Sequence, residues 1–158
     1  TAHAHEYTWG QCIFVDDKGP TIPACVVEGF SGRIKVAGIV TPCFSSLVVR
    51  RHGETHRFDG LFDLWRQRVT HDDLGWGLDI KGKAGRATLA MKATPSEVVC
   101  LGYNNPNGAV AYCLNSKLAY AHLRVEPVSG DVFDYESSHG GALEFLTQAP
   151  DSRFPSAV

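Results

Sequence analysis

The stretch Val98–Phe145 decides the fold; it opens with VVCLGYNNPNGAVAYCLNSKLAYAHLRVEP over residues 98–127 and closes with ESSHGGALEF over 136–145. Two apolar runs flank the turn-forming segment NNPNG at 104–108, a pattern typical of a β-hairpin. The second run breaks at Asn115-Ser116 and restarts as LAYAHLRV, whose side chains alternate between apolar and polar. Three consecutive strands with tight connections predict an antiparallel sheet.

The rest of the chain also has the pattern of short strands separated by turns. Glycine and proline recur about every ten residues, the spacing of an all-β protein, and period-two alternation marks further strands. We expect these strands at 7–15, 26–30, 33–40, 44–51, 55–58, 74–81 and 86–93. The segment FDLWRQRV at 62–69 fits a helix as well as a strand, and we interpret it as strand or irregular structure.

These strands predict a closed antiparallel β-barrel of about eight to ten strands, because closure removes exposed sheet edges and leaves room for one small ligand. A β-sandwich is the alternative architecture. We expect a single domain over residues 1–147 and an irregular C-terminal tail over 148–158, which has two prolines and no periodicity. No internal repeat points to a propeller.

Composition excludes several classes of protein. The 158 residues carry a net charge of −2 and 44% hydrophobic residues, as in an ordinary globular domain. No basic stripe predicts nucleic-acid binding, and no apolar run approaches the roughly 20 residues of a membrane span. No segment reads as a signal peptide. The chain starts at Thr1 rather than Met, which is compatible with trimming or with excision from a longer protein.

The five cysteines are scattered, odd in number and without CxxC spacing. This pattern argues against a disulfide scaffold and against a zinc site. We interpret them as small buried hydrophobic residues in a reducing cytoplasm. Cys100 and Cys113 lie on opposite arms of the predicted hairpin, so a bridge between them is the alternative.

Several short motifs together resemble a known family. The motifs, in chain order, are Trp9-Gly10-Gln11-Cys12, Glu28-Gly29-Phe30-Ser31-Gly32, Trp76-Gly77, Leu101-Gly102-Tyr103, Tyr112-Cys113, Asn115-Ser116 and Ala142-Leu143-Glu144. They resemble the lipocalin-like group that holds tocopherol cyclases, carotenoid 1,2-hydratases and AttH-type proteins. Those relatives usually have two lipocalin-like halves, and this chain is similar to the second half. In size it is closer to small single-barrel cyclases of natural-product biosynthesis.

The resemblance implies a lipocalin-like barrel that encloses a hydrophobic substrate and closes rings on it without a cofactor. In one mechanism a buried carboxylic acid protonates an alkene, because apolar surroundings raise the pKa of the acid. Glu144 and then Glu28 are the candidates for that acid. Aromatic faces would stabilise the resulting cation, and the candidates are Trp9, Trp65, Trp76, Tyr112 and Tyr120.

In a second, pericyclic mechanism no proton moves, and the pocket folds a polyene into a reactive shape. Hydrogen bonds to a carbonyl would polarise the reacting π-system; the candidate donors are Gln11, Tyr103, Tyr112, Asn115 and His122. The sequence does not choose between the two mechanisms. Structural roles compete with both: Glu144 can face water or pair with Arg124, and the tryptophans can belong to the core.

These observations lead to one functional prediction. We expect a cofactor-independent cyclase, or a related isomerase or lyase, that acts on a hydrophobic polyene or polyketide-type intermediate in the cytoplasm. The predicted catalytic residues are Glu28, Tyr112, Asn115 and Glu144, and the predicted substrate-binding residues are Trp9, Gln11, Trp65, Trp76, Tyr103, Tyr120 and His122. The alternatives are a non-catalytic carrier of an apolar small molecule and one half of a larger two-barrel protein. A homodimer is a candidate assembly.

One motif has metal-ligand character. His52, Glu54 and His56 form H-x-E-x-H, and alternate residues of a strand share a face. Gly53 marks a turn there and no fourth ligand is evident, so we predict no metal site. The chain also contains no glycine-rich phosphate loop and no GxSxG serine elbow.

Overall fold

The computed structural model describes residues 3–16, 23–60, 66–104, 108 and 110–157, with the backbone alone for residues 3–5. These residues form strands and turns and no α-helix, which confirms the predicted all-β class. The strands are β1 (His3–Phe14), β2 (Cys25–Val36), β3 (Ile39–Val40), β4 (Phe44–Arg51), β5 (Glu54–Phe58), β6 (Gln67–His71), β7 (Gly75–Gly82), β8 (Gly85–Lys92), β9 (Val99–Asn104), β10 (Val110–Pro127), β11 (Phe133–Thr147) and β12 (Ser156–Ala157). A 3₁₀ turn, η2 (Pro95–Glu97), precedes β9. Within the described part of the chain, no helix is long and apolar enough to cross a membrane.

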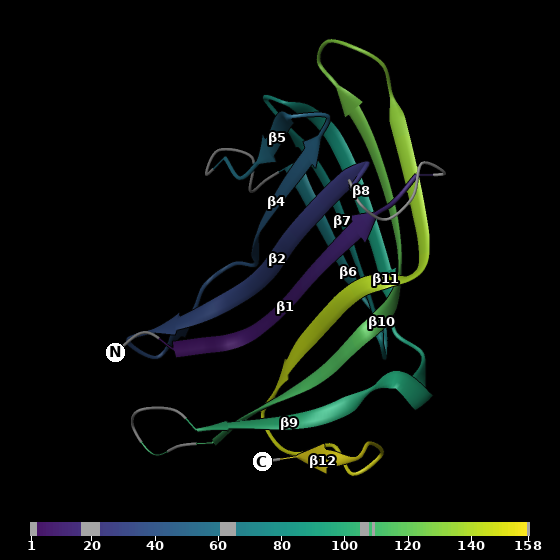
Figure 1. Cartoon of the computed structure of the whole chain (residues 1–158). Helices are drawn as coiled ribbons and strands as arrows, with labels where there is room; N and C mark the ends of the chain where they lie inside the picture. The colour runs from purple at the N-terminus through teal and green to yellow at the C-terminus, as the bar shows by residue number, and fades with distance from the viewer. Residues whose placement is uncertain (1–2, 17–22, 61–65, 105–107, 109, 158) are drawn as a thin grey trace.

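The strands belong to one sheet in the order β5-β4-β2-β1-β11-β10-β8-β7-β6, with β9 also paired to β10. All of these neighbours are antiparallel, as predicted, and β12 adds a short parallel pair to β9. The sheet coils strongly, so that β1, β2 and β4 pass in front of β6, β7 and β8 (Figure 1). The long strands β10 and β11 connect the two layers.

The predicted closure into a barrel is not found, because no backbone pairing joins the end strands β5 and β6 within the described residues. Side chains cross the gap instead. Gln67 of β6 donates from Nε2 to the carbonyl oxygen of Cys43 over 3.0 Å, and its Oε1 accepts a hydrogen bond from the Ser45 hydroxyl of β4. The sheet is therefore open between β5 and β6, and a side chain of β6 reaches across to the start of β4.

The interior between the layers is filled at its centre by Trp76 of β7, which is only 2% exposed. Its ring lies against the cross-strand pair Gly10 and Gly29, which bring β1 and β2 close to β7. A Cβ atom on Gly29 would lie 2.9 Å from Trp76 Cη2 and 3.0 Å from Leu47 Cδ1. Trp76, predicted to bind substrate, is a core residue whose ring packs against two glycines, which leave the room that a large ring needs. It also borders a groove of about 320 Å³.

The apolar residues that alternate along 74–81 and 86–93 form the inward faces of β7 and β8. Trp76, Leu78 and Ile80 of β7 are buried, as are Ala87, Leu89 and Met91 of β8. Burying one large apolar side chain of this kind contributes roughly 1.5–3 kcal/mol to folding. The alternating pattern thus selects which side of the coiled sheet faces inward.

Some predicted strand breaks are irregularities within continuous strands. Asn115-Ser116 was predicted to end a strand, but β10 continues through it with shifts of register between Ser116 and Ala121. The predicted segments 26–30 and 33–40 merge into β2, which then turns at Ala37 and Gly38, both with positive φ, into β3. Such two-residue turns with positive φ suit the twist of a hairpin.

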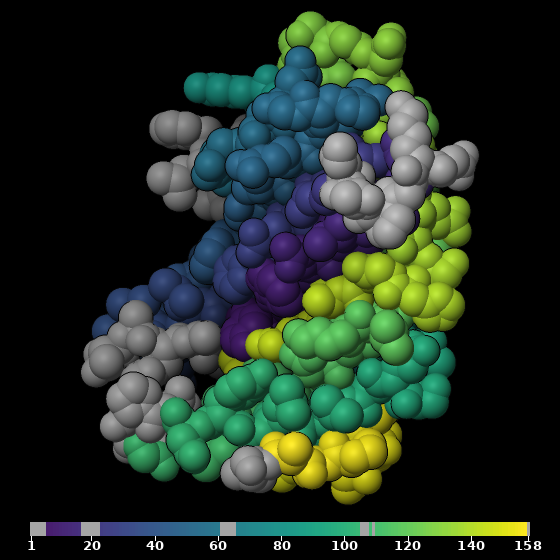
Figure 2. All heavy atoms as spheres, viewed as in Figure 1, coloured from purple at the N-terminus to yellow at the C-terminus, as the bar shows by residue number. Residues whose placement is uncertain are grey.

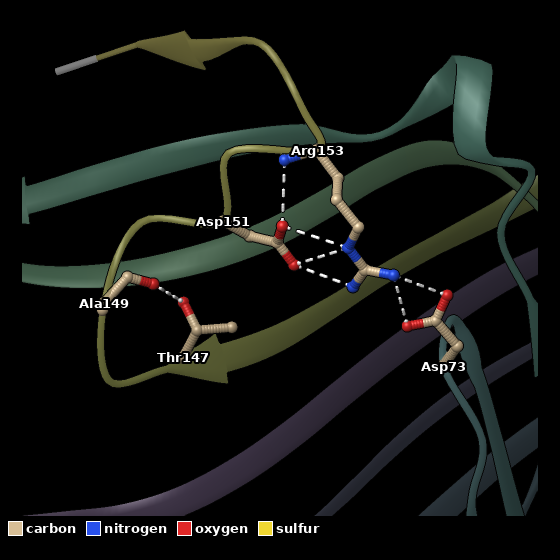
Figure 3. Close-up of polar contacts among 5 residues, drawn as sticks. All are labelled: Asp73, Thr147, Ala149, Asp151 and Arg153. Carbon is tan, nitrogen blue, oxygen red and sulfur yellow. Dashed lines mark hydrogen bonds and ion pairs between the residues drawn. The ribbon is translucent and has the colours of Figure 1, made fainter.

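The tail was predicted to be irregular, and its described part packs against the domain. Phe154 joins the core at 8% exposure, and Ser156 pairs with Cys100. Arg153 donates from Nη1 to both carboxylate oxygens of Asp73 over 2.8 and 2.9 Å, while Asp151 accepts from Nε and Nη2 (Figure 3). The tail is thus tied to the turn between β6 and β7.

The contact of Trp76 with Gly29 makes a testable prediction about stability. We expect Gly29→Ala to lower the free energy of unfolding by about 1–3 kcal/mol, because the added methyl group overpacks a filled core. Urea unfolding followed by tryptophan fluorescence measures this change.

Gly77→Ala on the outer face of β7 is the matched control. Its new methyl group would meet the Thr70 hydroxyl at 2.5 Å, at a surface where the threonine can rotate away. An equal loss of stability in both variants would show that the central packing against Trp76 is not the constraint.

Candidate functional site

The candidate site is a polar cluster of Tyr7, Cys113, Asn115 and Glu144 on three adjacent strands. Glu144 of β11 lies opposite Trp9 of β1 and opposite Asn115 of β10. Tyr7 precedes Trp9 by two residues and Cys113 precedes Asn115 by two, so period-two alternation puts all four side chains on one face. Figure 2 shows these strands side by side, with β1 in purple, β11 in yellow-green and β10 in green.

Hydrogen bonds connect the four side chains. The Tyr7 hydroxyl donates to Glu144 Oε1, and Asn115 donates from Nδ2 to Glu144 Oε2 over 2.8 Å. The Tyr7 hydroxyl also lies 3.2 Å from the Cys113 sulfur. Both oxygens of the Glu144 carboxyl group are therefore held by neighbouring side chains, and the carboxyl group has a defined orientation.

Burial determines where the protons of this cluster reside. It raises the pKa of Tyr7 far above its ordinary value, and the hydrogen bonds to Cys113 and Glu144 raise it further. Burial likewise raises the pKa of the Cys113 thiol to about 11, although the hydrogen bond with Tyr7 acts in the opposite direction. At neutral pH the phenol and the thiol both keep their protons, and Tyr7 is a firm hydrogen-bond donor.

A pocket of about 270 Å³ opens beside the cluster, at one end of the space between the two layers. Its lining consists of Glu6, Tyr7, Thr8, Ser31, Gly32, Cys43, His71, Phe145 and Leu146. Tyr7 is the residue that both lines the pocket and binds Glu144. Tyr7 thus links the wall of the pocket to the polar cluster, while its neighbour Thr8 points to the opposite face of β1.

The floor of the pocket is polar. Thr8 and Ser31, a cross-strand pair, are 3% and 1% exposed. The Thr8 hydroxyl lies 2.9 Å from His71 Nε2 of the opposite layer, and Trp76 Nε1 donates to the Ser31 hydroxyl over 2.9 Å. Two hydrogen bonds between layers thus close this end of the interior.

The environment of His71 favours its neutral form. Desolvation of the ring lowers its pKa, Glu6 acts in the opposite direction, and Arg33 adds to the lowering. A neutral imidazole offers either a donor or an acceptor to the Thr8 hydroxyl. Sequence reasoning missed both His71 and Tyr7, because their partners Thr8 and Glu144 lie 63 and 137 positions away in the chain.

The predicted catalytic residues do not all lie together in the structure. Asn115 and Glu144 come together as described, but Glu28 is exposed and accepts a hydrogen bond from Trp9 Nε1 over 3.0 Å. Gln11 lies opposite Glu28 and is half-buried. Tyr112 is on the other face of β10 and packs against the core.

The predicted binding residues also lie in different places. Tyr103 is 43% exposed, and burial together with the charges of Glu144 and Cys113 raises its pKa. Tyr120 and Trp76 line a groove of about 320 Å³, which shares His71 with the pocket beside Tyr7. His122 is hydrogen-bonded to Asp134 over 2.8 Å. Trp65 lies outside the described residues.

In the H-x-E-x-H motif, Glu54 Oε2 lies 4.0 Å from His56 Nε2, but the Glu54 side chain is 81% exposed at the turn between β4 and β5. The His56 ring packs 5.5 Å from the ring of Phe133. Among the described residues, no three His, Cys, Asp or Glu side chains are grouped to hold a metal ion. The described cysteines are all free thiols, including Cys100 and Cys113.

Comparison with known proteins returned no match: no family model, no curated protein and no solved structure is similar to this chain. The site must therefore be interpreted from its own geometry.

The lowered pKa of His71 predicts sensitivity to acid. Above the ordinary pKa of histidine, near 6.5, both folded and unfolded chains are neutral at this position. As the pH falls below that value, the unfolded chain binds a proton first, so folding becomes less favourable. We expect the urea midpoint to fall between about pH 6.5 and pH 5, and to fall less in His71→Gln.

His139→Gln, on the exposed part of β11, is the control for removal of a histidine. It should keep the wild-type dependence on pH. If His71→Gln also keeps that dependence, the interlayer contact with Thr8 contributes nothing to it.

Proposed function

We propose that this chain is a cofactor-independent cyclase, or a related isomerase or lyase, that moves a proton on a small apolar unsaturated substrate. One observation carries the proposal: Tyr7 lines the pocket and is hydrogen-bonded to a carboxyl group that Asn115 orients. A lipocalin-like architecture, opened at the β5 and β6 edges, and a cytoplasmic setting belong to the same proposal.

Tyr7 and Glu144 supply the chemistry as a relay. The Tyr7 oxygen takes a proton from the substrate while the Tyr7 proton passes to Glu144. The electron pair of the broken substrate bond then shifts a double bond or closes a ring, and the proton returns along the same path. Concerted transfer suits a phenol of raised pKa, because a free phenolate never has to form.

The size and lining of the pocket limit the substrate. A volume of about 270 Å³ is smaller than a typical drug-sized site, so a compact molecule fits and a long polyene does not. Phe145 and Leu146 provide apolar contact, while Thr8, Ser31 and His71 can orient a carbonyl oxygen. A simple carrier would need no such polar floor, and this favours the enzyme over the carrier.

The proton relay can be tested with the acyclic monoterpenoids citral and myrcene in deuterium oxide. We expect the wild-type chain to incorporate deuterium into at least one of them, detected by mass spectrometry. Tyr7→Phe and Glu144→Gln should each lower the rate by about 10²–10⁴-fold, because each removes one member of the relay.

Glu54→Gln, at an exposed turn remote from Tyr7, is the control and should keep the wild-type rate. A wild-type chain that closes a ring without deuterium uptake, and does so equally in Tyr7→Phe, would replace the relay with pericyclic, shape-based catalysis. No exchange and no product with either probe would overturn the proposal.

A further inference from the structure

A further concave site lies at the other end of β6, away from the two pockets that His71 lines. It is an open groove of about 670 Å³ between β6, the turn from β7 to β8, and the end of β10. Its lining consists of Arg66, Gln67, Arg68, Asp79, Lys81, Gly82, Gly85, Arg86, Glu126, Pro127 and Val128. Four of these side chains are cationic and two are acidic, in a chain whose net charge is −2.

Strand register gathers the cations on one face. Arg68 of β6 pairs with Asp79 of β7, and Lys81 of β7 pairs with Arg86 of β8. Asp79 and Lys81 are two residues apart on β7, so strand alternation puts their side chains and those of Arg68 and Arg86 on one face, and Arg66 precedes β6 beside them. The positive charges therefore form a patch rather than being spread around the sheet.

The acidic residues of the groove, Asp79 and Glu126, form ion pairs with Arg86 and Arg124. Asp79 accepts two hydrogen bonds from the Arg86 guanidinium, over 2.8 and 2.7 Å, which lowers the pKa of Asp79. Glu126 accepts a hydrogen bond from Arg124 over 3.1 Å. Among the ion pairs between described residues, none involves Arg66, Arg68 or Lys81.

We propose that this groove binds a phosphate-bearing ligand, with Arg66, Arg68 and Lys81 as the contacts to phosphate oxygens. Guanidinium groups match phosphate oxygens in pairs, and an ammonium adds a mobile point charge. Arg86 is held in an ion pair with Asp79, which offsets its charge, so the three other cations are the proposed contacts. Pro127 and Val128, the latter 75% exposed, offer apolar contact to an organic group attached to the phosphate.

This inference is independent of the proposed function, since the groove and the pocket share no lining residue. The proposed ligand group, a phosphate, occurs both in soluble metabolites and in lipid headgroups. Binding of either source would use the same cations, so the experiment has one arm for each.

The soluble arm is calorimetric titration of the full chain with inorganic pyrophosphate. We expect binding that weakens as salt screens the charges. Arg68→Gln and Lys81→Gln should each weaken it by about three- to tenfold, the effect of losing one exposed charged contact. Lys35→Gln on β2 removes the same positive charge outside the groove, so this variant should bind pyrophosphate as the wild type does.

The lipid arm is co-sedimentation with phosphatidylcholine vesicles that contain phosphatidic acid, compared with phosphatidylcholine alone. Binding of pyrophosphate without vesicles identifies a soluble phosphate, and binding of the acidic vesicles alone identifies a headgroup. The proposal is overturned if neither probe binds, or if Lys35→Gln weakens binding as much as the groove variants.

Discussion

The packing of Trp76 against Gly10 and Gly29 is the contact on which the architecture depends. An indole ring between two layers requires that one layer present bare backbone, and the cross-strand glycine pair does so. The ring then fills the centre of the coiled sheet, and its Nε1 proton is satisfied by Ser31. A central ligand cavity and this packing cannot coexist, so a binding site has to lie toward the ends of the interior.

The polar groups at one end of the interior are placed by the packing of Trp76. Ser31 accepts from Trp76, its cross-strand neighbour Thr8 contacts His71, and Tyr7 turns to the other face of the same strand. Adjacent residues of β1 therefore serve two functions, because a strand exposes alternate side chains to opposite faces. Thr8 joins the layers, while Tyr7 meets Glu144, a residue 137 positions away in the chain.

Strand β6 places two different chemical environments at its two ends. His71 closes a small, partly apolar pocket, whereas Arg66 and Arg68 face an open cationic groove. The first environment suits proton transfer in restricted solvent, and the second suits recognition of an anion in contact with water. Both depend on the antiparallel pairing of β6 with β7, which supplies Trp76 at one end and Lys81 at the other.

The sequence by itself determined the strand content, the antiparallel hairpins and the inward faces of β7 and β8, because alternation and turn residues are local signals. It also singled out Glu144 and Asn115, since polar residues within apolar strands are visible without a structure. Only the tertiary structure decided that the sheet stays open, that Trp76 fills its centre, and that Tyr7, Cys113 and His71 join the site. Those outcomes depend on how far the sheet coils and on which strands become neighbours, and contacts between residues so far apart in the chain leave no local pattern.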